Sequence, residues 1–209
     1  GHTLLMAVDL RGQWEADQPF WNASTRAPAD RLRDDLALLP EVAEAGLCDA
    51  AKDISMAGVL GTALMLAECS RVGLRIDVCA LPHPPGHAHD DTPEAFLRWL
   101  QAFPSYGYLL SVAPGHVAAV QARFISRGLA CAPIGTVEAG SGVWLQRGGL
   151  HHGPVGVGSH YQADQGRGIH GYDSLQLNVC LWLAKRAGKP AQNFSGRTIS
   201  TGCRKAILA

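Results

Sequence analysis

The chain has 209 residues, of which 47% are hydrophobic, so it holds enough apolar material for one large domain or two small ones with a real core. Lysine plus arginine equals aspartate plus glutamate at 18 each, so charge gives no reason to expect nucleic acid or an anionic membrane as a partner. Charged residues make up only 17% of the chain, which argues against extensive disorder and favours a buried interface.

Cysteine usage and hydropathy indicate a cytoplasmic location. The six cysteines form no C-x-x-C pair of the kind that a zinc or redox site needs, and we expect them to be reduced packing residues. No apolar run is long enough to span a bilayer, and residues 1–10 lack the length and basic flank of a signal peptide.

The first quarter of the chain predicts one strand and two helical pieces. Residues 4–10 are a nearly continuous apolar run, which is typical of a strand buried on both faces. After a polar, aromatic loop, Asp30 is placed to cap a helix. Pro40 is expected to start a second helical piece, which Gly46 can end in a left-handed conformation.

The next part predicts a buried helix at residues 59–72, closed by Gly73, and then a half-buried strand at 74–79. Residues 81–92 are rich in proline, histidine and aspartate and predict a loop. Thr92, the last of them, is expected to cap a helix that has Pro93 at its first position.

The rest of the chain predicts a strand at 108–112, a helix at 114–128, and β-segments at 129–137 and 143–145. This order of elements predicts an α+β fold in which helices cover a mixed β-sheet. Residues 148–209 are rich in glycine and histidine and receive no assignment, although 174–187 have a helical pattern.

Two segments resemble the C-terminal domain of the AIR synthetase (aminoimidazole ribonucleotide synthetase) superfamily. Residues 52–58 read K-D-I-S-M-A-G and lead into a helix that ends in A-E-C-S-R-V-G-L-R-I-D at 67–77. The superfamily shows Asp, then Ser or Thr, then a glycine pair, and a helix ending in A-E-x-S-x-V-G-x-x-I-D. Residues 103–120 and the I-G-T-V strand at 134–137 are similar to the second half of that domain. The resemblance covers about residues 27–145. Within the superfamily, this segment is most similar to uncharacterised bacterial AIR synthase-like proteins.

The resemblance implies three parts and a class of chemistry. Residues 1–26 are expected to be the last strand and linker of a mostly missing ATP-binding domain, 27–147 the AIR synthetase-like C-terminal domain, and 148–209 an unassigned tail. The full-length family uses ATP and Mg²⁺ to activate an amide or carbonyl oxygen as a phosphate ester, or to transfer phosphate. Without the ATP-binding half, we expect this chain to be inactive and not to bind ATP tightly.

Lys52, Asp53, Ser55 and Gly58 are the candidate substrate-binding residues. A carboxylate or hydroxyl just before a helix can cap its amides, and free amides there can hold a substrate anion. The resemblance favours this second role for Asp53 and Ser55. Gly58 allows a ligand or another backbone to come close. Lys52 is either a phosphate contact or a solvated surface lysine. The sequence predicts no catalytic residue.

Histidine and aromatic clusters are weaker candidates. A short loop holds residue types that bind metals, but no helix or strand fixes their spacing, so we expect no metal site; they are His83, His87, His89, Asp90 and Asp91. His151, His152, His160 and His170 raise the same question in the tail. The aromatic set of Trp14, Phe20 and Trp21 is either a ligand platform or, as we expect, a docking surface for a partner subunit or the missing domain.

Two classes of function stay open. The first is the substrate-side domain of an ATP-dependent enzyme. The second is a non-catalytic dimerisation or assembly module that pairs with a separate nucleotide-binding polypeptide. We expect a homodimer or the missing ATP-binding domain as the partner, an unknown small molecule as the substrate, and neither nucleic acid nor membrane. Beyond the AIR synthetase-like segment, the tail is either a flexible polar extension or the product of a truncated or frameshifted reading frame.

Overall fold

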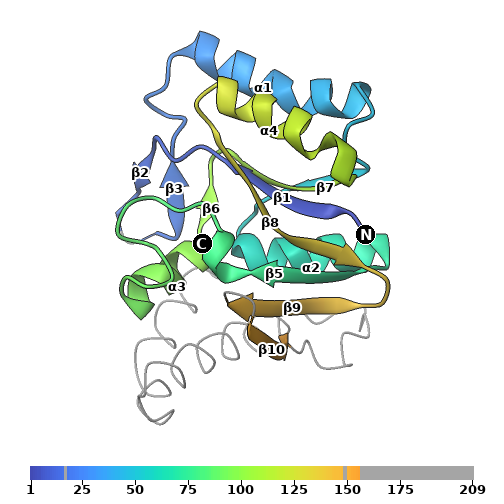
Figure 1. The fold of residues 1–209 in the computed structure, drawn as a ribbon. Helices are drawn as coiled ribbons and strands as arrows, with labels where there is room; N and C mark the ends of the chain where they lie inside the picture. The colour runs from blue at the N-terminus through green and yellow to red at the C-terminus, as the bar shows by residue number, and fades with distance from the viewer. Residues whose placement is uncertain (17, 148–149, 156–209) are drawn as a thin grey trace, which may run out of the picture. The chain divides into compact units, whose positions relative to one another are not determined.

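The protein is described by a computed structural model, which covers residues 1–16, 18–147 and 150–155. These residues fall almost wholly within one compact unit, Gly1–Pro154. Its centre is a seven-stranded sheet with the strand order β10-β9-β5-β8-β1-β7-β4 (Figure 1). Within this described part of the chain, no helix is both long enough and apolar enough to cross a membrane.

The first strand lies in the middle of this sheet. β1 (Thr3–Val8) pairs antiparallel with β7 (Gly107–Val112) on one side and with β8 (Ala130–Glu138) on the other. Its apolar run is buried on both faces, as predicted. The expectation that residues 1–26 belong to another domain is therefore wrong for this strand, because both of its edges are hydrogen-bonded inside the sheet.

The remaining strands make the sheet mixed, as predicted. β5 (Gly73–Asp77) pairs antiparallel with β8 but parallel with β9 (Gly142–Arg147). β10 (Leu150–Val155) lies beyond β9, and β4 (Ala50–Asp53) is the opposite edge, antiparallel to β7. The α+β fold with a helix-covered mixed sheet is confirmed.

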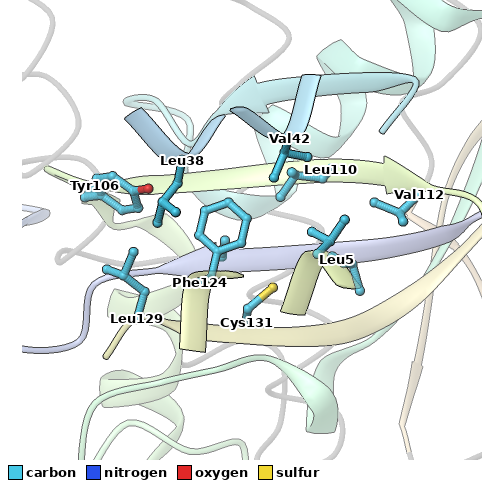
Figure 2. Close-up of a cluster of buried hydrophobic side chains, with 11 residues drawn as sticks. Leu5, Leu38, Val42, Tyr106, Leu110, Val112, Phe124, Leu129 and Cys131 are labelled. Atoms are coloured by element: carbon cyan, nitrogen blue, oxygen red, sulfur yellow. The ribbon is translucent and has the colours of Figure 1, made fainter. Parts of the chain in front are cut away.

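Two helices cover one face of the sheet. They are α1 (Ala29–Glu44) and α4 (Val117–Ser126), which follows the short 3₁₀ turn Pro114–His116. Their inner side chains form a buried core with alternate residues of β1, β7 and β8, and Figure 2 shows these side chains gathered between helices and sheet. Phe124 and Leu110 are completely buried there, and each such side chain contributes about 1.5–3 kcal/mol relative to exposure.

The other face is covered by α2 (Gly58–Ser70), which packs against α3 (Pro93–Gln101). Figure 1 shows α2 on the side of the sheet away from α1 and α4. α2 is buried on several sides, as its sequence predicts. The 3₁₀ turn Val78–Ala80 and the predicted loop connect β5 to α3, where the Thr92 hydroxyl accepts the expected capping bond from the Ala95 amide at 3.2 Å.

Three short strands form a second sheet that the sequence analysis did not predict. They are β2 (Gln13–Trp14), β3 (Phe20–Asn22) and β6 (Phe103–Pro104), in the order β2-β3-β6. β3 and β6 pair in parallel and bring the rings of Phe20 and Phe103 into a stack with centroids 4.8 Å apart. The loop after β1 is thereby held against the segment before β7.

Three predicted helix ends differ from the structure. α1 begins after Pro28 and its N-cap makes no side-chain hydrogen bond, so Asp30 is not the cap. Pro40 lies inside a continuous α1 rather than starting a second piece; its ring is on the exposed side, where water can hydrate the carbonyl that loses its partner. The left-handed residue that ends α2 is Arg71, at φ 55°, and Gly73 instead opens β5.

Candidate functional site

Lys52 and Asp53 lie at the end of edge strand β4. The ammonium group of Lys52 donates to the Asp53 carboxylate at 3.0 Å, and the Asp53 side chain is 66% exposed. Asp53 is directly opposite Tyr108 in the antiparallel pair with β7. Burial raises the pKa of Tyr108, and the negative charge of Asp53 raises it further. Both predicted residues therefore remain accessible to a ligand.

Ser55 and Asp53 do not cap the following helix. The N-cap of α2 is Ala57, with no side-chain hydrogen bond. The Ser55 amide donates to the hydroxyl of Thr62, and the Ser55 carbonyl accepts from the Gly58 amide at 2.8 Å. The plain capping interpretation is thus wrong. The Gly58 amide is already bonded within the turn and is not a free donor for an anion.

Gly58 is required by packing between two helices. It has a φ of +65°, a left-handed conformation that favours glycine. A Cβ atom built on it would lie 2.1 Å from the carbonyl oxygen of Leu100, near the end of α3. Of the two possibilities left by the sequence, the close approach is therefore to another backbone.

A buried charge network at the end of β1 was missed by the sequence analysis. Asp9 and Asp35 are 2% and 1% exposed. The Arg11 guanidinium joins them, since its Nε donates to Asp9 Oδ1 at 2.8 Å and its Nη2 donates to Asp35 Oδ2 at 3.0 Å. The hydrogen bond to Asp9 is the main reason why the pKa of Arg11 is raised above its ordinary value. Arg11 is thereby fixed in position and always charged.

Two further arginines complete the network. Arg127 donates to Asp35 Oδ1 at 3.2 Å and to exposed Asp34 at 3.0 Å. Arg31 lies 3.5 Å from Asp9 Oδ2 and 3.8 Å from Asp35 Oδ2. Two buried carboxylates thus pair with three arginines. The exposed fractions of the Arg11, Arg31 and Arg127 side chains are 34%, 26% and 34%. The network holds β1, α1 and the end of α4 together.

A polar pocket opens beside this network. Its volume is about 380 Å³, and it is formed by the loop after β1, the end of β3 and the residues leading into α1. The polar side chains that line it are Arg11, Gln13, Glu15, Asn22, Thr25, Arg26 and Arg31. A small concave site lined by several donors is the kind of feature that binds a small polar ligand.

The sequence indicates the charge network but not the pocket beside it. Asp9 follows directly on a buried apolar run, and Asp35 has helical spacing with the inner residues Leu38 and Val42. An aspartate on the inner face of a helix needs a partner if it is to stay charged. The pocket itself has no such signal, because its wall depends on the small sheet.

The family model for AIR synthase related proteins, C-terminal domain, matches residues 6–146. This chain belongs to that family. The match begins inside β1, which agrees with the central place of that strand in the sheet. The resemblance noted in the sequence is confirmed.

Relatives of this AIR synthase related chain are longer than it is. An uncharacterised protein of Synechocystis sp. is 40% identical over 149 residues, which are 71% of this chain and 44% of that protein. An uncharacterised protein of Methanocaldococcus jannaschii is 32% identical over 112 residues, 53% of this chain and 32% of the relative. The chain thus spans less than half the length of these relatives.

Solved structures show the same fold. PurLQS from Thermotoga maritima matches with a TM-score of 0.56 and 14% sequence identity, over 73% of this chain and 24% of the other. T. maritima PurL complexed with ATP matches with a TM-score of 0.54 and 13% identity, again over 73% and 24%. At sequence identities this low, these matches show a shared AIR synthase related fold and nothing about function.

The aromatic residues of this AIR synthase related domain pack largely on one another. Trp14, Trp21 and Trp99 meet edge to face, with centroids 5.5–6.2 Å apart. The Trp14 indole donates to His87 Nε2 at 3.0 Å, and the Arg98 guanidinium lies 4.0 Å from the Trp14 ring centroid. These contacts within the chain hold Trp14 and Trp21 in position, and docking of the aromatic set against a partner stays a prediction.

The predicted histidine loop is likewise engaged locally. His83 Nδ1 and His87 Nδ1 each lie within hydrogen-bonding distance of a proline carbonyl, and His89 is 4.0 Å from Asp90. Among the residues that the structure describes, no group of three or more His, Cys, Asp or Glu side chains is placed to hold a metal ion. The tail histidines from His151 onward lie outside the described side chains.

Proposed function

We propose that this chain is the substrate-side domain of an ATP-dependent enzyme that activates an oxygen by phosphorylation or transfers a phosphoryl group. The observation that carries the proposal is the family match over residues 6–146 in a chain that spans less than half of its longer relatives. T. maritima PurL has the same fold in its complex with ATP, which is consistent with a nucleotide-using enzyme.

The exposed polar groups support a binding role at one end of the sheet. In the sheet register, Asp53 is opposite Tyr108, which in turn is opposite Ala7. Asp9 is two residues beyond Ala7, so the end of β4 and the charge network share this end of the sheet. We propose that Lys52 and Asp53 contact the substrate there, with Ser55 beside them in the turn before α2.

The chemistry available to this domain is binding and orientation. ATP supplies the phosphoryl group in such a reaction, and catalysis comes from positioning and charge neutralisation. Among the described residues no group of three or more His, Cys, Asp or Glu side chains could hold a metal ion, and we assign no Mg²⁺ ligand to them. Fixed arginines can hold an anionic part of the substrate and exclude water from it. The nucleotide and its metal would be held by another part of the protein.

ATP binding tests this division of roles. Isothermal titration calorimetry of ATP with Mg²⁺ against this chain is expected to show no tight binding. The longer Synechocystis relative, titrated under the same conditions, is expected to bind. Submicromolar binding by this chain would contradict the separation of nucleotide and substrate sides. Absence of binding and of ATP turnover in the longer relative would remove the ATP-dependent proposal altogether.

A second candidate function is an assembly module. Met56 follows β4 and is 69% exposed, an unusual position for a large apolar side chain. Among the described strands, β4 is an edge with no partner on its outer side. Such an edge can pair with another chain. We propose that this edge and Met56 contact a second copy of the chain or a nucleotide-binding polypeptide.

Light scattering during size-exclusion chromatography tests this contact. The chain is expected to elute as a dimer, and Met56→Glu is expected to shift it toward monomer because a charge would be buried at the interface. The matched control is Leu36→Glu, at an exposed apolar residue of α1 that is 54% accessible, and it should leave the mass unchanged. A wild-type monomer at high protein concentration would count against this contact.

A further inference from the structure

The polar pocket beside the charge network offers more hydrogen-bond donors than its own residues use. The Arg31 Nε atom is buried and has no hydrogen-bond partner among the described residues. Asp35 Oδ2 lies 3.8 Å from it, which is too far for a hydrogen bond. Nε is closed off from solvent, so the Arg31 donor left for a ligand is Nη1, which makes no hydrogen bond among the described residues.

Arg26, in the segment that leads into α1, adds a second set of donors. Its side chain is exposed at the pocket wall, and its one hydrogen bond in the described structure goes from Nη1 to Gln13 Oε1 at 3.3 Å. A guanidinium has five N–H donors, so most of those on Arg26 face solvent. Arg26 and Arg31 therefore present unused donors to the same pocket.

The pocket is pre-organised for such a ligand. Arg31 Nη2 also donates to the Ala23 carbonyl at 2.8 Å, and Arg11 is fixed by both buried carboxylates. These contacts fix two guanidinium groups before any ligand arrives, which lowers the entropy lost on binding.

The N-terminus of α1 adds an electrostatic field that favours an anion in the pocket. This helix has 16 residues, and its N-cap Pro28 makes no side-chain hydrogen bond to the first amides. Ala27, immediately before it, lines the pocket. The partial positive charge at a helix N-terminus favours an anion nearby.

Charge balance defines what kind of anion fits. Arg11, Arg31 and Arg127 are balanced by Asp9, Asp34 and Asp35, and the pocket residues Arg26 and Glu15 balance each other. Attraction must therefore come from donor geometry rather than from net charge. Planar guanidinium groups that approach from different elements suit a tetrahedral oxyanion with several acceptor oxygens.

We propose that this pocket, lined by Arg11, Arg26 and Arg31, is an oxyanion site that binds a phosphate group. A volume of about 380 Å³ leaves room for a small organic group attached to that phosphate. The inference deepens the proposed function, in which fixed arginines hold an anionic part of the substrate. Its test is separate, because phosphate binding here requires neither ATP nor the other half of a longer enzyme.

Titration of inorganic phosphate into the whole chain tests the site. The heat of binding is measured at constant ionic strength, set with chloride, because screening weakens exposed contacts. We expect saturable binding with a Kd of about 1 mM or tighter. Arg26→Gln is expected to weaken it about tenfold through loss of charge-assisted hydrogen bonds. Arg31→Lys keeps the charge but loses the planar set of donors, and a similar loss is expected.

The matched control is Arg33→Gln, at an exposed arginine of α1 that pairs with Asp30 and does not line the pocket. It should bind phosphate like the wild type. Since Arg26 is exposed, its variant should also melt like the wild type, so that a change in affinity reports on the site. No saturable phosphate binding, or binding that Arg26→Gln and Arg31→Lys leave unchanged, would overturn the proposal. Acetate that competes as well as phosphate would overturn the assignment to a tetrahedral anion.

Discussion

Replacement of Asp35 by asparagine is expected to lower the free energy of unfolding by about 3 kcal/mol, the low end of the range for breaking a buried ion pair. Asp35 is 1% exposed and contacts three arginines, Arg11, Arg31 and Arg127. The substitution leaves the size unchanged but removes the charge that these guanidinium groups share. Their partial exposure to water limits the loss. Urea denaturation followed by circular dichroism measures it.

Asp34→Asn is the matched control for Asp35→Asn. Asp34 is the neighbouring residue on α1, is 61% exposed, and pairs with Arg127 at 3.0 Å. An exposed ion pair of this kind contributes about 0–1 kcal/mol, so the control should differ little from the wild type. Equal effects of the two substitutions would show that the buried network does not hold β1, α1 and α4 together.

The second large effect is expected for Gly58→Ala, which should destabilise the chain by about 3 kcal/mol or more. The new Cβ would lie 2.1 Å from the Leu100 carbonyl oxygen and 2.8 Å from the Gln101 Cα atom, and neither backbone atom can move without shifting the end of α3. The left-handed φ of +65° adds a conformational cost for alanine.

Gly46→Ala separates the two contributions. Gly46 has almost the same φ, +64°, but a Cβ atom there would meet nothing within 4 Å. Only the conformational cost remains, about 1 kcal/mol. Thermal unfolding of both variants gives the difference due to the α2–α3 contact. If the two substitutions lower the stability equally, close packing against α3 is not the reason for Gly58. The alternative that Gly58 makes room for a ligand would then be favoured.

The sequence predicts the large elements of the fold because each has a regular apolar pattern. The run from Leu4 to Val8 indicates a fully buried strand. α2 is an apolar run of helical length, and α3 has helical spacing after a capping threonine. β2, β3 and β6 were not predicted, because strands of two or three residues have no periodicity to detect. Their pairing brings together residues about 80 positions apart.

The candidate site was predictable only in part for a related reason. Lys52 and Asp53 were proposed from a local motif, and the structure leaves Asp53 exposed and Lys52 partly exposed. Asp9 and Asp35 lie far apart in the sequence and are joined by Arg11, so no local sequence pattern predicts the network. A carboxylate near a strand end or in a helix is usually solvated, and only the packing of α1 on β1 shows that these two are not.

The position of β1 has a consequence for how the chain folds during synthesis. Its residues Thr3–Val8 are synthesised before both of their partner strands, which lie more than 95 positions later, at Gly107–Val112 and Ala130–Glu138. Contacts of such long range close slowly, because the intervening chain must be ordered first. A short apolar segment therefore waits unpaired until most of the domain has left the ribosome. During that interval the segment is exposed to chaperones and to pairing with a neighbouring nascent chain.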